Sequence, residues 1–381
     1  MRKHVPLLSV FVILIGFSAN AINFSRVNVA WQYDPTFDLR MAHRVVRMDE
    51  GMKVFLRISS DSLSTWQYEF LVQDGYESES HRTIQPVNVD TLLQTPSQVM
   101  VAILLPKLDE NLLVLKSSKS ERFFYYDIQI MIGSLSFPSI YPVNATGLPI
   151  LEKYINRSGF SWVGNDTFLA RQYQEKFGGA DPPMADMKPL APQVAMDTSF
   201  IFGDSVQFKE NHFYVVSKDS LATVGVTMLR VSPYFPEYRQ LGELIGAMLY
   251  LTSEQEKKAM LKSRNLKQSF DSFWMNTYST KGRARTAIRN YYDWIERVNI
   301  LFTDFKPGWK TDRGMMYLVF GRPDEVYRTA NSEEWYYDDG QAFEFTVIST
   351  FFAPRTYTLR RSKEYEEQWY TKIASLRQEI R

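Results

Sequence analysis

Alternating apolar and polar residues dominate the first third of the chain. This two-residue period is typical of strands with one buried face. It predicts strands at Val27–Tyr33, Met52–Ile58, Trp66–Val72 and Phe123–Met131. The continuous apolar run Val99–Leu105, closed by Pro106, predicts a central strand. Roughly seven strands at this spacing indicate an immunoglobulin-like β-sandwich over residues 22–132, in architecture only, because the chain has no Cys pair.

The β-like pattern continues in a segment rich in Pro and Gly, which predicts a second β-rich domain over residues 133–235. The stretch Gly178–Pro183 is expected to form a loop. Strands are predicted at Phe200–Phe208, His212–Ser217 and Ala222–Val231. Two prolines in Ser232–Pro236 break both helix and strand, so this segment is expected to act as a linker.

A helical period replaces the strand period in residues 236–381. Ser253 and Glu256 form a capping-box pattern at the start of one helix. Apolar residues three and four apart predict a long helix over Ala284–Phe305. A second apolar stripe predicts a helix from Ser362 to Ile380, capped by Ser362. That stripe either covers the strands of its own module or docks in a groove on a partner.

The first 21 residues have the three parts of a secretory signal peptide. Arg2 and Lys3 are followed by the apolar run Val5–Phe17 and by an A-x-A site at Ala19–Ala21. We therefore expect cleavage before Ile22 and export to the periplasm or the outer cell envelope. No later segment has the roughly 20 consecutive apolar residues that a transmembrane helix needs.

Charge and composition narrow the function classes. The chain has 44 basic and 43 acidic residues, so it has no global charge that favours nucleic acid. Cleavage would remove two bases and no acid, leaving 42 basic against 43 acidic residues. The absence of Cys excludes thiol nucleophiles and Cys-ligated metals. Residues 254–289 contain nine bases and three acids, either a solvated helical surface or a docking face for an acidic partner.

The segment 306–326 contains the most specific pattern in the chain. Gly308, Trp309, Thr311 and Asp312 form a GWxTD motif, and Glu333–Tyr337 and Phe343–Phe345 follow it. With these residues the chain resembles the GWxTD domain family over about residues 233–381. The resemblance implies an exported bacterial protein of Bacteroidota-like lineages. It supplies no established catalytic residues.

Local chemistry gives the motif a mostly structural interpretation. Pro307 and Gly308 are expected to end the long helix, and Trp309 to fill a corner between helix and strand. Thr311 and Asp312 are expected to accept hydrogen bonds in turns, and Met315–Phe320 to form a strand followed by a turn at Gly321–Asp324. The candidate motif residues are Gly308, Trp309, Thr311, Asp312, Arg313, Gly321, Pro323 and Asp324.

No established catalytic motif occurs in the chain, and its few His residues are far apart in the sequence. The sequence therefore favours a multidomain β and α+β protein of the cell envelope without catalytic activity or cofactor. Its GWxTD module would mediate protein–protein interaction or assembly. The alternative is an envelope hydrolase or carbohydrate-binding protein that uses Trp309, Asp312 and Asp324. A pocket lined by Asp312, Arg313 and Arg322 would favour that alternative.

Overall fold

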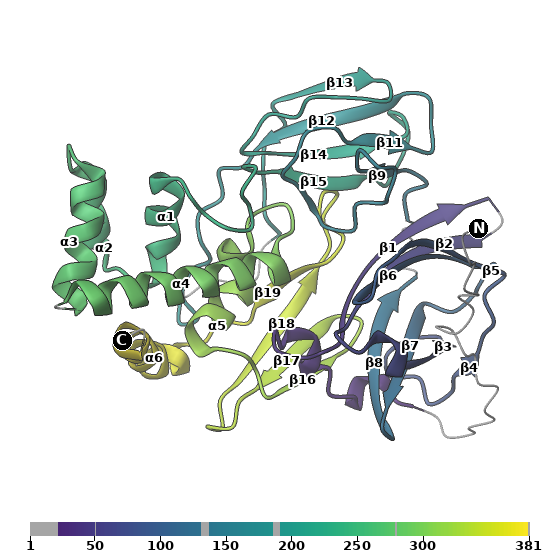
Figure 1. Ribbon diagram of the computed structural model, residues 1–381, viewed down its shortest axis with the longest axis horizontal. Coiled ribbons are helices and arrows are strands. Elements are labelled where there is room, and N and C mark those ends of the chain that lie inside the picture. The colour runs from purple at the N-terminus through teal and green to yellow at the C-terminus, as the bar shows by residue number, and fades with distance from the viewer. Residues whose placement is uncertain (1–21, 50, 131–136, 186–190, 279, 380–381) are drawn as a thin grey trace, which may run out of the picture.

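The computed structural model describes residues 22–49, 51–130, 137–185, 191–278 and 280–379. The predicted signal peptide, Met131, Ile132 and Ile380 lie outside these ranges. Figure 1 shows two β-rich regions, one above and one at the lower right, beside a helical region at the left. The C-terminal sheet lies between the helices and the lower β-rich region. No helix in the described ranges is long and apolar enough to cross a membrane.

The first β-rich region consists of two four-stranded antiparallel sheets over one apolar core. One sheet has the order β1-β2-β6-β5, and the other has the order β4-β3-β7-β8. The predicted strands over residues 52–58, 66–72 and 99–105 are confirmed as β2, β3 and β6, and β6 is central in its sheet. The eight strands are β1 (Arg40–Met48), β2 (Gly51–Ser59), β3 (Gln67–Gln73), β4 (Arg82–Thr83), β5 (Asn88–Gln94), β6 (Gln98–Leu105), β7 (Leu112–Lys119) and β8 (Arg122–Gln129).

The predicted strand at Val27–Tyr33 is wrong. The second half of this segment forms the short 3-10 turn η2 (Ala30–Tyr33), and another 3-10 turn, η1 (Phe24–Arg26), precedes the segment. Side chains of Asn23 and Asn28 accept backbone hydrogen bonds there and so compete with strand pairing. Phe24, Val29 and Tyr33 are buried in a core that they share with the C-terminal helices and sheet. A short alternation of apolar and polar residues is compatible both with a strand and with such turns.

The second β-rich region contains a five-stranded sheet in the order β10-β15-β14-β12-β13 and a two-stranded sheet of β9 and β11. The strand predicted at His212–Ser217 is confirmed as β14, and Gly178–Pro183 is a loop as expected. The strands are β9 (Tyr141–Val143), β10 (Tyr154–Ile155), β11 (Ser161–Val163), β12 (Phe168–Gln174), β13 (Thr198–Phe202), β14 (His212–Ser217) and β15 (Val226–Arg230). One face of the sheet packs against Phe235, Phe305 and Phe352 of the following segments.

The C-terminal region combines helices with a four-stranded antiparallel meander, β16-β17-β18-β19. Its helices are α1 (Leu241–Ala247), α2 (Glu254–Lys262), α3 (Leu266–Tyr278), α4 (Lys281–Phe302), α5 (Asp312–Phe320) and α6 (Glu366–Glu379), with the 3-10 turns η4 (Met248–Tyr250), η5 (Gly308–Lys310) and η6 (Lys363–Tyr365). Its strands are β16 (Glu325–Arg328), β17 (Ser332–Tyr336), β18 (Ala342–Ile348) and β19 (Thr356–Leu359). The Ser253 capping box is confirmed. Ser362 caps the 3-10 turn η6, and α6 itself begins after this turn, at Glu366.

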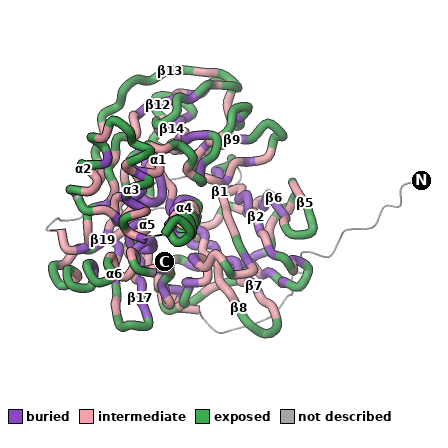
Figure 2. The backbone as a smooth tube through the Cα atoms, turned by 60° about the vertical axis from the view of Figure 1, so that its left-hand side comes forward, coloured by how far each residue is buried: buried purple, intermediate pink, exposed green. Residues whose placement is uncertain are grey.

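Two predictions for this region are wrong. Met315–Phe320 is part of helix α5, because Thr311 caps its first turn and the helix is buried on all sides. The long helix ends at Phe302 and not at Phe305, so Pro307 and Gly308 begin the next turn. Figure 2 shows buried residues concentrated where α4 and α5 meet the sheets, and exposed residues along the outer loops.

Candidate functional site

The GWxTD motif lies in the tight connection between α4 and α5. Gly308 packs directly on α4, where an added Cβ would lie 2.1 Å from the carbonyl oxygen of Val298. A Cβ on Gly314 would lie 1.9 Å from the carbonyl oxygen of Gly308. Both positions therefore require glycine for close backbone approach. The two glycines hold η5 against α4 and direct α5 back across the core.

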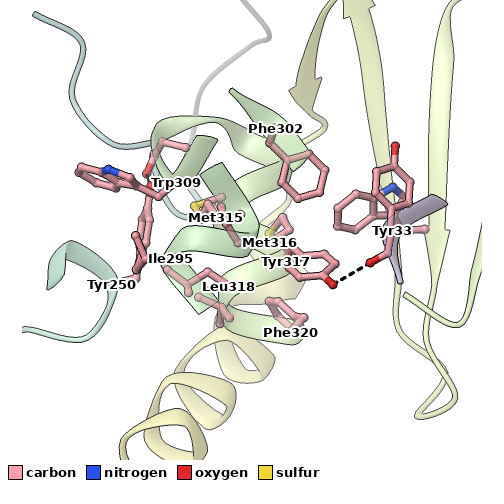
Figure 3. Packing of buried hydrophobic residues seen from close by; sticks show 14 of the residues in the cluster. Tyr33, Tyr250, Ile295, Phe302, Trp309, Met315, Met316, Tyr317, Leu318 and Phe320 are labelled. Atoms are coloured by element: carbon pink, nitrogen blue, oxygen red, sulfur yellow. Dashed lines mark hydrogen bonds between the residues drawn. The ribbon is translucent and has the colours of Figure 1, made fainter. Parts of the chain in front are cut away.

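Trp309 is buried beside this turn, with 6% of its surface exposed. Its indole Nε1 donates a hydrogen bond of 2.9 Å to the Tyr238 hydroxyl, and its ring meets Tyr250 edge-on. Figure 3 shows Trp309 and Tyr250 together on one side of α5, and Phe302 and Tyr33 on the other. Because the ring is enclosed, it offers no free face on which a sugar could stack.

The remaining motif residues join the turn to neighbouring elements. Thr311 caps α5: its Oγ1 accepts a hydrogen bond of 3.0 Å from the Gly314 N–H. Asp312 accepts a hydrogen bond of 2.7 Å from the Leu359 N–H of β19. Its carboxylate also forms an ion pair of 3.0 Å with Arg361. The third position, Lys310, pairs with Glu175 of the second β-rich region at 2.7 Å.

Arg313 directly follows the motif and belongs to a buried ionic cluster around Glu333. The Glu333 side chain is 0% exposed. The Glu333 carboxylate accepts hydrogen bonds from Arg328 Nε at 2.7 Å and from the Tyr33 hydroxyl at 2.8 Å. Trp335 Nε1 donates another at 2.8 Å, and Arg313 Nη1 lies 3.4 Å away. Each carboxylate oxygen therefore has several donors, as a buried charge requires.

The same cluster reaches the first β-rich region through Asp127 of β8. Arg328 Nη1 donates to Asp127 at 2.6 Å, and the Tyr76 hydroxyl donates at 2.7 Å. Burial alone would raise the pKa of Asp127, but Arg328 and then the hydrogen bond from Tyr76 bring it down to about 2. Burial likewise opposes ionisation of Glu333, and Arg328 and Arg313 hold its pKa below the ordinary value. Both acids are therefore charged near neutral pH.

The remaining candidate residues lie at the other end of α5. Gly321 ends the helix with a φ of 85°, which favours glycine, and Pro323 is buried. Arg322 forms an ion pair with Asp34. Asp324 accepts a hydrogen bond of 2.8 Å from the Asp338 N–H. Asp312 lies at the first position of α5 and Asp324 beyond its end, and among the described residues the two carboxylates share no hydrogen-bond partner.

A cavity of about 260 Å³ opens beside the N-terminal end of α5. Asp312 and Arg313 line this cavity, whereas Arg322, Asp324 and Trp309 do not. The sequence pointed to Asp312 and Arg313 but not to the other charged residues of the wall, which are the bases Lys306, Arg355 and Arg361 and the acids Asp181 and Asp304. It also missed Tyr33, Arg328 and Asp127 of the buried cluster. The sequence drew attention to the cluster only at Glu333, because the segment Glu333–Tyr337 resembles the GWxTD domain family.

No three His, Asp or Glu side chains come together as a possible metal site in the part of the chain that the structure describes. A search of curated proteins finds no match to the chain. The family model of the GWxTD domain matches residues 212–378, which adds strands β14 and β15 to the region expected from the sequence. With this match, and with Gly308–Asp312 placed in the connection from α4 to the first turn of α5, the chain is identified as a protein that contains a GWxTD domain.

Proposed function

We propose that this protein is a non-catalytic binding protein of the cell envelope. Its GWxTD module would dock on an acidic surface of a partner protein through the basic end of its helices. This basic helical end consists of α2, α3 and the first half of α4, and it lies at the outer left edge of the molecule in Figure 1. Its partners would be envelope proteins, and the proposal assigns no role to nucleic acid.

One observation carries the proposal: a stripe of unpaired bases on α4. Lys281, Arg285 and Arg289 follow one another at intervals of four residues and therefore lie on the same helix face. All three are exposed, and none forms an ion pair with another described residue. Lys262 and Arg264 add exposed charge at the end of α2. Such a surface attracts an acidic partner and orients its approach.

Two acids near this surface already have partners of their own. Asp271 already pairs with Lys267 one turn away on α3. Glu256 pairs with Arg377 of α6 at 2.9 Å. The excess positive charge of the helical end is thus available to a partner. At the motif, by contrast, the charges of Glu333, Arg328 and Asp312 are committed to one another or to Arg361, which favours binding over catalysis.

Export and the nature of the first domain belong to the same proposal. The proposed signal peptide would deliver the mature chain, beginning at Ile22, to the periplasm or the outer envelope. The two packed four-stranded sheets support an immunoglobulin-like module, an architecture common in adhesion and assembly proteins. Mass-spectrometric sequencing of the exported protein tests the processing step, and an intact Met1 would contradict it.

Crosslinking and affinity capture from the native envelope, followed by mass spectrometry, test the docking surface. The variant combines Lys281→Glu, Arg285→Glu and Arg289→Glu. Acidic residues near the N-terminus of α4 suit the helix dipole, so the variant is expected to fold. We expect it to lose the partner that the native chain captures, and the native capture to weaken as salt concentration rises.

A matched control reverses three exposed bases elsewhere: Arg122→Glu, Arg157→Glu and Lys218→Glu. These residues also form no ion pair with another described residue. The control variant has the same net charge as the α4 variant and should keep the partner. Equal capture by both variants would contradict docking at α4. Loss of the captured protein after nuclease treatment would instead point to nucleic acid bound by the basic stripe.

A further inference from the structure

The cavity beside α5 has basic side chains in its wall, and not all of them form ion pairs within the protein. Lys306 and Arg355 both line the cavity. Neither forms an ion pair with another described residue. Elsewhere in the same region the bases are paired, as Lys310 is with Glu175 and Arg361 with Asp312. These two bases therefore lack an ion-pair partner in a partly enclosed cavity. Of the three acids in the same wall, Asp304 pairs with Lys153 and Asp312 with Arg361, and Asp181 is the third.

Lys306 has only partial compensation for the burial of its ammonium group, from cation–π contacts and from nearby carboxylates. Its Nζ lies 5.8 Å from the ring centre of Phe177 and 5.9 Å from that of Phe305. Burial lowers the pKa of Lys306, and the nearby carboxylates of Asp312 and Glu175 only partly offset this effect. An anion in the cavity would supply the charge that these residues do not.

Hydrogen-bond donors in the wall are also unsatisfied. Nε and Nη2 of Arg355 and Nε of Arg361 are buried and have no acceptor within the described residues. The Arg361 side chain is 7% exposed. Buried donors without acceptors are rare in proteins and call for an explanation. Nearby Tyr357, Tyr76 and Asp127 outweigh burial and keep the pKa of Arg355 above its usual value, so the guanidinium stays charged.

The wall also contains aromatic side chains, together with the acids Asp181, Asp304 and Asp312. Phe177, Phe302, Phe305 and Tyr357 line the cavity, and the first turn of α5 adds the positive end of a helix dipole. A volume of about 260 Å³ suits a small molecule and is too small for a folded partner. The ligand must therefore combine one anionic group with a compact apolar body.

We propose that this cavity binds a small carboxylic acid with an aromatic or aliphatic body. Its carboxylate lies between Lys306 and Arg355, and its body lies against the aromatic wall. Arg forks and Lys ammonium groups both recognise carboxylates through charge-assisted hydrogen bonds. The inference does not depend on docking at α4, because the cavity and the basic helical end share no residue.

Titration of the full chain with 4-fluorobenzoate, followed by fluorine NMR, tests the proposal. We expect saturable binding to the native chain. Lys306→Gln and Arg355→Gln should each weaken binding by about tenfold or more. The matched control is Lys310→Gln, four residues away, whose ammonium is already paired and does not line the cavity. It should bind as the native chain does.

Two further probes define the ligand class. Neutral 4-fluorobenzyl alcohol should bind much more weakly than 4-fluorobenzoate, because it lacks the charge. Inorganic phosphate should compete only weakly, because it cannot use the aromatic wall. Absence of saturable 4-fluorobenzoate binding, equal binding of the alcohol, or unchanged affinity in folded Lys306→Gln would overturn the proposal. Preferential binding of phosphate would overturn the assignment to carboxylic acids.

Discussion

Tyr33 and Glu333 are 300 positions apart in the sequence, yet the Tyr33 hydroxyl donates a buried hydrogen bond of 2.8 Å to the Glu333 carboxylate. The Tyr33 oxygen also accepts hydrogen bonds from Arg328 at 2.6 Å and from Arg313 at 3.0 Å. One hydroxyl thus connects the N-terminal turn η2 with helix α5 and with the C-terminal sheet. A polar network of this kind is favourable only when every member is satisfied.

Removal of the Tyr33 hydroxyl should therefore destabilise the whole chain. Tyr33→Phe leaves two guanidinium groups with fewer acceptors and Glu333 with one donor fewer. We expect the free energy of unfolding to fall by about 1 to 3 kcal/mol. Tyr336→Phe is the control, because the Tyr336 hydroxyl binds Glu334 at an exposed site. Urea denaturation of both variants makes the comparison, and equal losses would contradict a special role for Tyr33.

Trp309→Ala removes a buried ring from the core that joins α1, α5 and α6. We expect a loss of about 3 to 5 kcal/mol, the range for truncation of a large core aromatic. Thermal melts of the full chain measure it. The full chain is needed because the core of the GWxTD module is continuous with side chains of the N-terminal turns. A variant with native stability would show that Trp309 is not a core residue.

Asp312→Asn tests the ion pair between α5 and the end of β19. The sequence suggested a turn acceptor, whose replacement by Asn would cost about 1 kcal/mol or less. The structure adds the Arg361 guanidinium, which would lose a buried counter-charge. We therefore expect about 1 to 3 kcal/mol. A double-mutant cycle with Arg361→Gln measures the interaction energy between the two side chains. Additive losses would exclude coupling between Asp312 and Arg361.

Helix α6 presents two adjacent aromatic residues in different surroundings. Trp369 is buried against Phe320 and Tyr250, whereas Tyr370 is 57% exposed. Trp369→Ala should cost about 3 to 5 kcal/mol, and Tyr370→Ala less than about 0.5 kcal/mol. Deletion of residues 362–381 should unfold the module. A folded, monomeric deletion variant would contradict the inclusion of α6 in the core.

Local sequence signals predicted those elements whose stability depends on neighbours in the chain. The Ser253–Glu256 capping box and the apolar stripe of α6 are examples, because both depend on residues three or four apart. The same reasoning assigned α5 to a strand, since a six-residue apolar run has no clear period when all of its faces are buried.

The buried ionic cluster could not be predicted in this way. Arg328 and Glu333 are near one another in sequence. From the sequence alone, both would be placed on strands at a solvated sheet edge. Their burial depends on Tyr33 and Asp127, which lie 295 and 201 positions from Arg328. No pattern in a single sequence connects residues at such separations. The cavity wall has the same origin, because Phe177, Lys306 and Arg355 come from three distant segments.

The stability of the chain should also depend on pH through His43 of β1. Its Nδ1 lies 2.9 Å from the Tyr126 hydroxyl, inside the first β-rich region. Burial lowers the pKa of His43 to about 4, although nearby Asp127 opposes this shift. Between pH 6.5 and pH 4 the unfolded chain therefore binds a proton that the folded chain does not, and stability falls as the pH falls.

Each pH unit in this window corresponds to about 1.4 kcal/mol, so we expect a loss of about 2 kcal/mol between pH 6.5 and pH 5. Asp127, with its pKa of about 2, contributes only at lower pH. Urea denaturation at several pH values between about 6.5 and about 5 measures the slope. His43→Gln should remove most of that slope, whatever its effect on stability at pH 7. An equal slope in the native chain and in His43→Gln would assign the pH dependence to other groups.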